Sequence, residues 1–247
     1  MASMSEPIRI AMWSGPRNIS TAMMRSFGAR ADTVVVDEPF YAIYLLESGI
    51  DHPLRDESIA SQSHRPEQVV KDLLAPLPEG KSIYYQKHMT HHMVAAITLD
   101  WMAHCRNVFL IRDPTLVIAS YLQKRETINL ADIGVVRQWE IFQREADRLG
   151  HAPAVIDGNT LLSDPRRWLQ TLCAAVEIPF TDAMLTWAPG TRTTDGVWGK
   201  HWYQAVEQST GFALPKSIEA VQLPTALQDL VSQALPYYQF LLAHHLP

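Results

Sequence analysis

Hydrophobic and polar positions follow two patterns that alternate along the chain. Short apolar runs rich in β-branched residues predict buried strands, and longer runs with an apolar residue every three or four positions predict helices. The predicted strands span 8–13, 33–36, 82–86, 107–111 and 153–156. The predicted helices span 19–28, 41–48, 67–74, 114–124, 133–149 and 165–175. This alternation predicts an α/β fold of three layers, α/β/α, with a central mainly parallel sheet between helices on both faces.

The residues that flank the helices mark two of their starts and one of their ends. Asp113 and Asp164 each precede a proline, so the carboxylate caps the helix and the proline takes the first helical position. Gly150 follows the helix at 133–149 and ends it. One apolar stripe of that helix consists of Val136, Trp139, Phe142, Ala146 and Leu149.

Three further segments have weaker patterns. The polar stretch 48–66 forms either a lid over a substrate or an ordinary surface connection. The stretch 191–211, which contains glycine and tryptophan, predicts a loop. The tail from Pro215 predicts a helix that ends near Leu242.

Composition places the chain in the globular class and narrows its partners. With 247 residues, 47% hydrophobic and 19% charged, it suits a single domain over 1–247. The net charge of -5 argues against a general nucleic-acid binder. The first six residues lack an apolar signal core, and no run reaches the ~18 apolar residues of a membrane span. Cys105 and Cys173 form no CxxC pair. We therefore expect a soluble cytoplasmic protein without nucleic-acid or membrane partners.

The first predicted strand leads into a helix through a turn rich in hydrogen-bond donors. The free N–H groups of the first helical turn and the positive end of the helix dipole face one point there. Side-chain donors in the turn add to them, so we predict a site for a phosphate-like or sulfate-like anion. The turn consists of Ser14, Gly15, Pro16, Arg17, Asn18, Ile19, Ser20 and Thr21.

This turn differs from the Walker A loop of ATP and GTP hydrolases. The Gly-Lys-Ser at 80–82 matches part of that motif. Position 75, however, is Ala75 rather than glycine, and a predicted strand follows where the motif needs a helix. An ATP or GTP hydrolase is therefore disfavoured.

A second candidate anion site follows the strand at 107–111. Arg112 leaves the carboxyl end of that strand, where open α/β sheets bind ligands, and arginine suits bidentate capture of phosphate. Ser120 lies about two turns into the next helix, from which its hydroxyl reaches back. The alternative is a structural ion pair between Arg112 and Asp113.

Both segments resemble signatures of the sulfotransferases that use 3′-phosphoadenosine 5′-phosphosulfate (PAPS). The turn at 14–21 is similar to the P-R-S-G-T-T loop that cradles the 5′-phosphosulfate, with Asn18 and Ile19 where the family has Ser and Gly. Residues 112–120 resemble R-D-P-x-x-x-x-x-S, whose Arg and Ser bind the 3′-phosphate. Because β-branched residues tolerate positive φ poorly, we expect the turn to differ locally at Ile19 or to keep right-handed conformations there.

Two later segments extend the resemblance. Residues 155–165 are similar to the family's Y-E-D-L-x-x-D-P segment, and we expect a mainly structural role for them. Residues 196–202 resemble the G-x-x-G-x-W-K loop that folds over the nucleotide. The resemblance implies that Arg192 and Lys200 pair with the 3′-phosphate. The alternative is an aromatic surface loop with solvated cations.

Taken together, the resemblance implies a PAPS-dependent sulfotransferase with a fold like that of the P-loop nucleotide hydrolases. Its product is adenosine 3′,5′-bisphosphate (PAP), and its acceptor is a small hydroxylated molecule with an apolar body. Sulfuryl transfer needs a cation at the leaving phosphate, for which Arg17 is the candidate. Aromatic residues that suit the acceptor, or equally the core, are Trp13, Phe40, Tyr41, Tyr44 and Trp101.

The base that accepts the hydroxyl proton has several candidates. Glu38 follows the strand at 33–36, at the sheet edge beside the phosphate loop, and several bacterial and tyrosylprotein sulfotransferases use a glutamate in a comparable region. Lys87 and His88 follow the strand at 82–86, and Lys87 matches the lysine of the family's K-T-H motif, which assists the leaving group. His88 and His91 are the alternative bases.

The histidines at 88, 91 and 92 do not predict a metal. They lack the glutamate of H-E-x-x-H and have no cysteine nearby. Two other functions remain open at this stage: an atypical P-loop kinase of small molecules that binds ATP and Mg²⁺, and a non-catalytic PAP- or PAPS-binding protein. The sequence makes no prediction of the oligomeric state.

Overall fold

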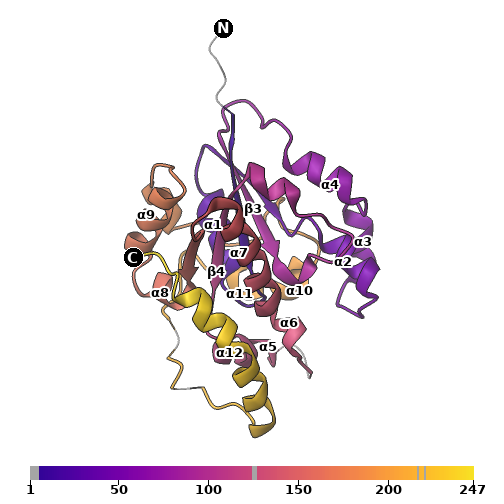
Figure 1. The fold of residues 1–247 in the computed structure, drawn as a ribbon. Coiled ribbons are helices and arrows are strands. Elements are labelled where there is room, and N and C mark those ends of the chain that lie inside the picture. The colour runs from indigo at the N-terminus through magenta and orange to yellow at the C-terminus, as the bar shows by residue number, and fades with distance from the viewer. Residues whose placement is uncertain (1–5, 124–126, 216, 220) are drawn as a thin grey trace.

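A computed structural model describes residues 6–123, 127–215, 217–219 and 221–247. Five parallel strands form its central sheet in the order β2-β3-β1-β4-β5 (Figure 1). The strands are β1 (Ile8–Ser14), β2 (Thr33–Asp37), β3 (Ile83–Met89), β4 (Arg106–Ile111) and β5 (Ala154–Asp157). All five predicted strands are present, and the three-layer α/β/α prediction is confirmed.

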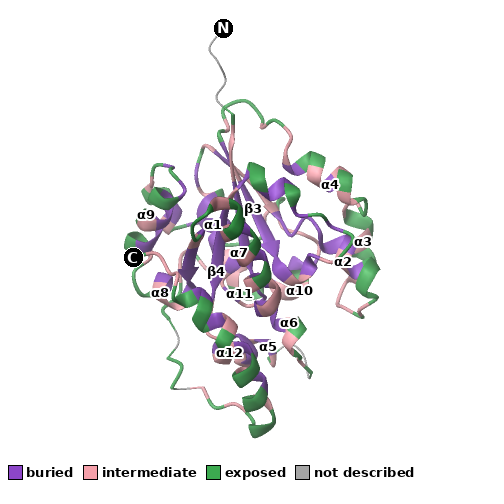
Figure 2. Cartoon of the chain, in the orientation of Figure 1, coloured by how far each residue is buried: buried purple, intermediate pink, exposed green. Residues whose placement is uncertain are grey.

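Helices cover both faces of the sheet because side chains alternate between the faces along each strand. Ile10 and Met12 of β1 pack into one hydrophobic cluster, and Ala11 and Trp13 pack into the other. The first cluster includes buried residues of α1 (Ser20–Gly28), α9 (Pro165–Ala175) and the 3-10 helix η3 (Asp182–Leu185). The second includes α5 (Pro114–Tyr121), α7 (Val135–Leu149) and α12 (Gln228–Leu242). Figure 2 shows the buried strands between helices whose outer sides are exposed.

The predicted helices are present, with two differences at their ends. Gly134, at φ 73°, separates a short α6 (Leu130–Ile133) from α7, so the helix predicted at 133–149 is broken near its start. The helix predicted at 114–124 ends at Tyr121, and Lys124 lies outside the described residues. Residues 1–5, which belong to the segment expected to carry no signal core, also lie outside them. The end at Gly150 is confirmed.

Both predicted Asp-Pro helix starts are confirmed by their hydrogen bonds. The Asp113 carboxylate accepts from the Thr115 amide at 2.8 Å, and the Asp164 carboxylate accepts from the Arg167 amide at 3.2 Å. The first of these caps fixes the start of α5, the helix that carries Ser120.

The predicted apolar stripe of α7 is not the face that lies deepest. Phe142 is buried, but the other four stripe residues are only half-buried, and Trp139 packs against Tyr237 of α12. The deepest face instead includes two polar residues, Gln138 and Glu145. Helix α12 covers most of the apolar stripe from outside, and Phe142 also packs against Phe109 of β4. The periodicity therefore identified mainly a helix–helix contact.

Three segments have a structure that differs from the irregular or helical structure predicted for them. The stretch 48–66 contains α3 (Arg55–Ser61) ahead of α4 (Pro66–Leu73), and the stretch 191–211 contains α10 (Gly199–Trp202) and α11 (Gln204–Glu207). The helix predicted from 215 is wrong for the described residues before 225, because Pro224 interrupts a continuous helix there. None of the described helices is long and apolar enough to cross a membrane.

Candidate functional site

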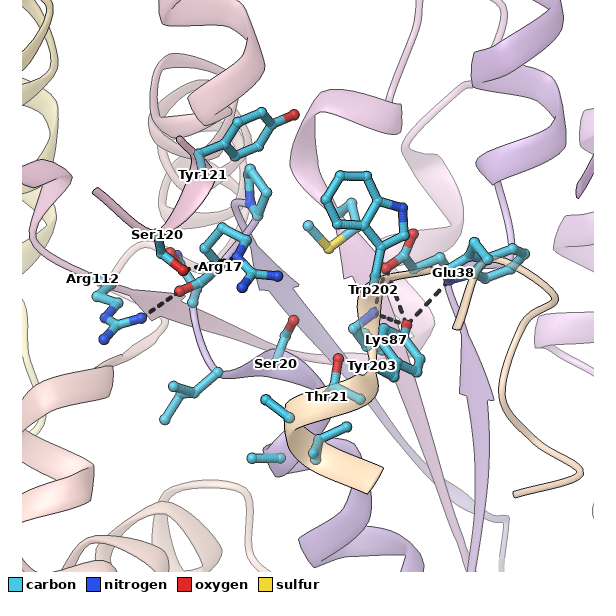
Figure 3. Close-up of a pocket in the computed structure, with 18 of the residues that line it drawn as sticks. Arg17, Ser20, Thr21, Glu38, Lys87, Arg112, Ser120, Tyr121, Trp202 and Tyr203 are labelled. Atoms are coloured by element: carbon cyan, nitrogen blue, oxygen red, sulfur yellow. Dashed lines mark hydrogen bonds and ion pairs between the residues drawn. The ribbon is translucent and has the colours of Figure 1, made fainter. Parts of the chain in front are cut away.

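The carboxyl ends of β1, β2, β3 and β4 open onto a cavity of about 300 Å³ (Figure 3). Its lining comes from segments far apart in sequence, between Pro16 and Ala213. Ligand sites of open parallel α/β sheets lie at this edge, outside the carboxyl ends of the strands. The cavity therefore lies where the strand order predicts a ligand.

The turn after β1 forms one wall of the cavity and presents the start of α1. Residues 16–22 all line the cavity, and no side chain caps α1 and no acidic residue lies in its first turn. Figure 3 shows the hydroxyls of Ser20 and Thr21 between the Arg17 side and the Lys87 side of the cavity. The first N–H groups of α1 therefore remain available to an anion.

Ile19 takes the left-handed conformation, with φ 57° and ψ 14°. Of the two outcomes expected for the turn, a local difference or right-handed conformations only, the second is therefore wrong at this position. Five described non-glycine residues have positive φ, and three of them, Arg17, Ile19 and Glu38, line the cavity. Such strained residues concentrate at functional sites, where the surrounding structure holds them in place.

Arg17, Arg112 and Ser120 meet at a second corner of the cavity. Arg17 Nε donates to Ser120 Oγ at 3.0 Å, and Arg112 Nη1 donates to the Arg17 carbonyl oxygen at 2.7 Å. Arg112 and Ser120, which were predicted to hold one anion, therefore contact Arg17, which was predicted to hold another. The Arg112–Asp113 ion pair considered above is not formed in the described part of the chain.

The two arginines at this corner are desolvated cations. Burial lowers the pKa of Arg17 and of Arg112, which shows that both guanidinium groups have lost hydration. Neither guanidinium forms an ion pair with a described carboxylate, and Arg112 Nε is buried without a hydrogen-bond partner among the described residues. Desolvated, unpaired arginines together with a helix start provide the donors that phosphate and sulfate groups bind.

Lys87 lies on the opposite wall of the cavity, in a buried charged cluster. Its Nζ donates to Asp37 Oδ1 at 2.9 Å, to Glu38 Oε1, and to the Tyr203 hydroxyl at 2.8 Å. The Lys87 side chain is 1% exposed. Glu38 follows β2 directly, as predicted, and lines the cavity.

The charges of this cluster shift each other's pKa values. Burial opposes the charged form of Lys87, but the carboxylates of Asp37 and Glu38 outweigh burial and raise its pKa. Burial raises the pKa of Glu38, and the charge of Asp37 raises it further against the opposing effect of Lys87. Glu38 is therefore a stronger base than a glutamate in water.

His88 does not reach the cavity, because β3 runs three residues further than predicted. Lys87 and His88 lie inside this strand and not after it, so they point to opposite faces of the sheet. His88 stacks on Trp13 at 4.6 Å between ring centroids, is fully buried, and has a pKa lowered by burial to about 3. The candidate base at His88 is not brought to the site.

The other candidate histidine lies at the cavity wall. His91 lines the cavity and, like His88, has a pKa lowered to about 3, here by burial together with the nearby His52 and Lys87. His92 was not among the candidate bases, yet it lines the cavity too, and its ring stacks on those of Tyr41 and Tyr44. Its Nδ1 lies 3.9 Å from Glu38 Oε2.

Besides His88, four predicted site residues lie outside the cavity wall. Ser14 is fully buried with its hydroxyl directed to the His88 carbonyl, and Gly15 packs against the Ile133 carbonyl. Arg192 donates to carbonyl oxygens of its own loop, including that of Gly190 at 3.1 Å. Lys200 is exposed on α10. None of the four is among the residues that line the cavity.

Several lining residues were not among the predicted site residues. Trp198, Trp202 and Tyr203 come from the segment predicted as a loop over the nucleotide, and His52 comes from the stretch considered as a lid. Of the five aromatic residues considered for the acceptor, only Tyr41 lines the cavity. Within the described residues, no group of three His, Cys, Asp or Glu side chains could hold a metal ion.

Comparison with known proteins gives the family. The sulfotransferase domain family matches residues 8–245. Two *Arabidopsis thaliana* proteins, branched-chain-amino-acid aminotransferase-like proteins 1 and 2, are 37% and 34% identical over 98% and 95% of this chain. The chain spans 43% and 41% of their lengths, so it corresponds to less than half of each.

Solved structures show the same fold. The sulfotransferase domain of the Synechococcus PCC 7002 olefin synthase is 20% identical, with a TM-score of 0.58 over 99% of this chain and 98% of that domain. A sulfotransferase domain from the curacin biosynthetic pathway is 18% identical, with a TM-score of 0.57 over 98% of this chain and all of that domain. The chain belongs to the sulfotransferase domain family.

Proposed function

We propose that this chain transfers a sulfuryl group from PAPS to a hydroxyl of a small acceptor and releases PAP. The observation that supports this best is the pair of anion positions along one wall of the cavity. One lies at the uncapped start of α1, and the other lies at Arg112 and Ser120. A nucleotide that carries anionic groups at both its 5′ and 3′ positions needs two such positions.

The first position would hold the 5′-phosphosulfate. The N–H groups at the start of α1, with the hydroxyls of Ser20 and Thr21, would bind the sulfuryl and phosphate oxygens. Arg17 would neutralise the charge that develops on the leaving phosphate. The resemblance assigns this task to Lys87 as well, but all three Lys87 N–H donors are bound by the protein. We therefore propose Arg17 as the main leaving-group cation.

The second position would hold the 3′-phosphate. Arg112 has an unpaired buried Nε, and Ser120 accepts from Arg17 while its own proton remains available to an anion. Arg192 and Lys200 stay part of the expected nucleotide site only if their segment rearranges, since neither lines the cavity.

Glu38 is the proposed base. The acceptor oxygen forms a bond to sulfur while the bond from sulfur to the 5′-phosphate oxygen breaks, and the phosphate keeps that electron pair. Glu38 takes the proton from the acceptor hydroxyl. Its raised pKa makes it a better proton acceptor near neutral pH, and the hydrogen bond from Lys87 holds its carboxylate at the cavity wall.

The acceptor side of the cavity suits an uncharged molecule. Burial keeps His91 and His92 neutral, and the Lys87 charge is offset by two carboxylates. The remaining wall near Glu38 is aromatic, with Tyr41, Trp198 and Trp202. A neutral alcohol or phenol with an apolar body fits these surroundings better than an anionic one.

The proposal extends to the organisation and location of the protein. Residues 1–247 would form a single domain, because a complete sulfotransferase domain covers 99% of the chain. A cytoplasmic location agrees with the two cysteines, which are both free and buried.

The Glu38→Gln variant tests the assigned base. We expect kcat to fall about 100-fold or more, because the amide cannot accept the proton, while PAP affinity stays unchanged. As the pH is lowered, the transfer rate of the wild type should begin to fall at a pH above the usual glutamate pKa of about 4.3. The reason is that the raised pKa of Glu38 lets this carboxylate become protonated, and so unable to accept a proton, at that higher pH. Transfer of radiolabelled sulfate from PAPS to a panel of neutral alcohols and phenols measures both effects.

The exposed Glu47 of α2 (Tyr41–Ser48) provides the matched control, because Glu47→Gln makes the same chemical change away from the cavity. Full activity of Glu38→Gln would remove Glu38 as the base. Tight PAP binding by a wild type that transfers sulfate to no acceptor would instead favour the non-catalytic binding protein.

A further inference from the structure

The hydrogen-bond capacity of Lys87 is used up within the protein. An ammonium group has three N–H donors, and those of Lys87 go to Asp37, Glu38 and Tyr203. The first two partners lie at the end of β2, next to Lys87 on the sheet. The third comes from a segment 116 residues further along the chain.

Tyr203 completes this network with a single buried hydroxyl. Its oxygen accepts from Lys87 Nζ at 2.8 Å and from Trp198 Nε1 at 3.2 Å, and its proton goes to Asp37 Oδ2 at 2.7 Å. Tyr203 is 5% exposed. Figure 3 shows the Tyr203 hydroxyl beside Lys87 and Glu38 at the cavity wall.

The segment that ends at Tyr203 is tied down through the same carboxylate. Asp37 Oδ2 also accepts from the Gly196 amide at 3.0 Å. Next to Gly196, the Asp195 carboxylate accepts two hydrogen bonds from the buried Arg25 guanidinium of α1. Asp37 therefore joins the position of Lys87 to the docking of residues 195–203.

This segment also supplies part of the cavity wall. Trp198, Trp202 and Tyr203 all line the cavity, and Tyr41 packs edge-on against Trp198 at 4.9 Å between centroids. The hydrogen bonds of Asp37 and Tyr203 therefore serve two purposes. They dock residues 195–203, and they hold the charged Lys87 opposite the start of α1.

We propose that Tyr203 is a positioning residue, whose hydroxyl docks residues 195–203 onto Asp37 and holds Lys87 so that Glu38 stays in place to accept the acceptor proton. This inference rests on the proposed function, since it assigns Tyr203 a task in that reaction. Tyr203 acts through Lys87 and Asp37 and does not itself transfer the proton.

Removal of the hydroxyl leaves a buried lysine donor without a partner and removes one donor from Asp37. Buried polar groups left unpaired are costly, so the cluster rearranges and the segment loosens. The anion positions at Arg17 and Arg112 belong to other elements and are unaffected. Loss of the hydroxyl should therefore lower kcat much more than it weakens nucleotide binding.

The Tyr203→Phe variant of the full chain tests this, with three measurements. Hydrogen exchange read by mass spectrometry should show peptides over 195–203 exchanging at least ten times faster. The rate of sulfate transfer from PAPS should fall tenfold or more. The dissociation constant for PAP, measured by calorimetry, should change less than threefold.

Tyr85→Phe is the matched control. Tyr85 lies on β3 two residues before Lys87, and its buried hydroxyl has no hydrogen-bond partner among the described residues. We expect wild-type exchange and activity from it. Asp37→Asn is the second variant, and it should loosen 195–203 as well, because the amide retains the shape but not the charge that holds Lys87.

Unchanged exchange over 195–203 in Tyr203→Phe, or an unchanged transfer rate, would overturn the proposal. The failure of the proposed function is distinguishable. If the wild type transfers no sulfate, that function fails, and faster exchange in Tyr203→Phe and Asp37→Asn still supports the docking role. If Glu38→Gln alone keeps full activity, the base assignment fails.

Discussion

Ile19 occupies the position where the family loop that it resembles has glycine, and it adopts a conformation that glycine favours. Its side chain packs against α8 (Gly158–Ser163), since a Cβ placed on Gly158 would lie 3.4 Å from Ile19 Cγ1. The left-handed conformation costs a residue other than glycine about 1–2 kcal/mol. The packing of this side chain offsets part of that cost, which explains how an isoleucine persists in the turn.

The Ile19→Gly variant measures this balance. Glycine relieves the strain but loses half-buried packing, so we expect unfolding free energy to fall by no more than about 1 kcal/mol. Ile59→Gly is the matched control. Like Ile19, Ile59 is half-buried against the hydrophobic cluster that includes residues of α1 and α9, but it lies inside α3. There the loss of packing and of helix propensity should cost about 2 kcal/mol or more.

Urea denaturation followed by tryptophan fluorescence gives both values. If Ile19→Gly destabilises the protein as much as Ile59→Gly does, the left-handed strain at Ile19 is not real, and the turn has another conformation in solution.

At the residue scale, the sequence predicted the side chains of the two proposed anion positions better than the other residues that line the cavity. Arg17, Arg112 and Ser120 follow strand ends or sit on the next helix, and strand ends of a parallel sheet meet at one edge. Tyr203 and His52 could not be predicted in the same way. They reach the cavity through the tertiary placement of surface segments, which no local pattern encodes.

Among the elements, the ends of β1, β3 and β4 decide which residues face the cavity. The sequence predicted β3 three residues too short, because Lys87 and His88 are polar and Met89 is followed by more histidines. Lys87 and His88 are buried inside the strand although they are polar, so their polarity does not mark where the strand ends. The error changed the predicted placement of His88, since successive strand residues point to opposite faces and Lys87 takes the one that faces the cavity.

Helix α7 holds together the two strands whose ends lead into the proposed anion positions. Gln138 is buried, and its Nε2 donates to the Trp13 carbonyl of β1 at 2.9 Å and to the Leu110 carbonyl of β4 at 2.9 Å. The polar face of α7, which the apolar periodicity did not identify, therefore holds two strands together one residue before the end of each.

The Gln138→Leu variant tests this role of α7. It removes two buried hydrogen bonds, and we expect unfolding free energy to fall by about 1–3 kcal/mol. Gln143→Leu on the same helix changes a half-buried glutamine in the same way and should shift it by less than about 0.5 kcal/mol. Equal effects of both variants in urea denaturation would show that the two bonds do not stabilise the strand ends.

The whole molecule assembles the cavity from residues distant in sequence. Arg17 and Ser120 are 103 residues apart, and Lys87 and Tyr203 are 116 apart. The order of strands and helices was predictable from alternating patterns, because each element carries its own periodicity. The cavity was predictable where candidate residues follow strand ends, as at Arg17, Glu38 and Arg112, and not where residues of the 195–203 segment complete its wall.

The central claim is that the cavity binds a nucleotide with anionic groups at both the 5′ and 3′ positions. Calorimetric titration of PAP, AMP and ATP–Mg²⁺ into the wild type and into Arg112→Met tests it most directly. Arg144→Met, on the exposed side of α7, provides the matched control. We predict that the wild type and Arg144→Met bind PAP about tenfold or more tightly than AMP, and that Arg112→Met loses this preference. Equal affinities of the wild type for PAP and AMP, or tighter binding of ATP–Mg²⁺ than of PAP, would contradict the account.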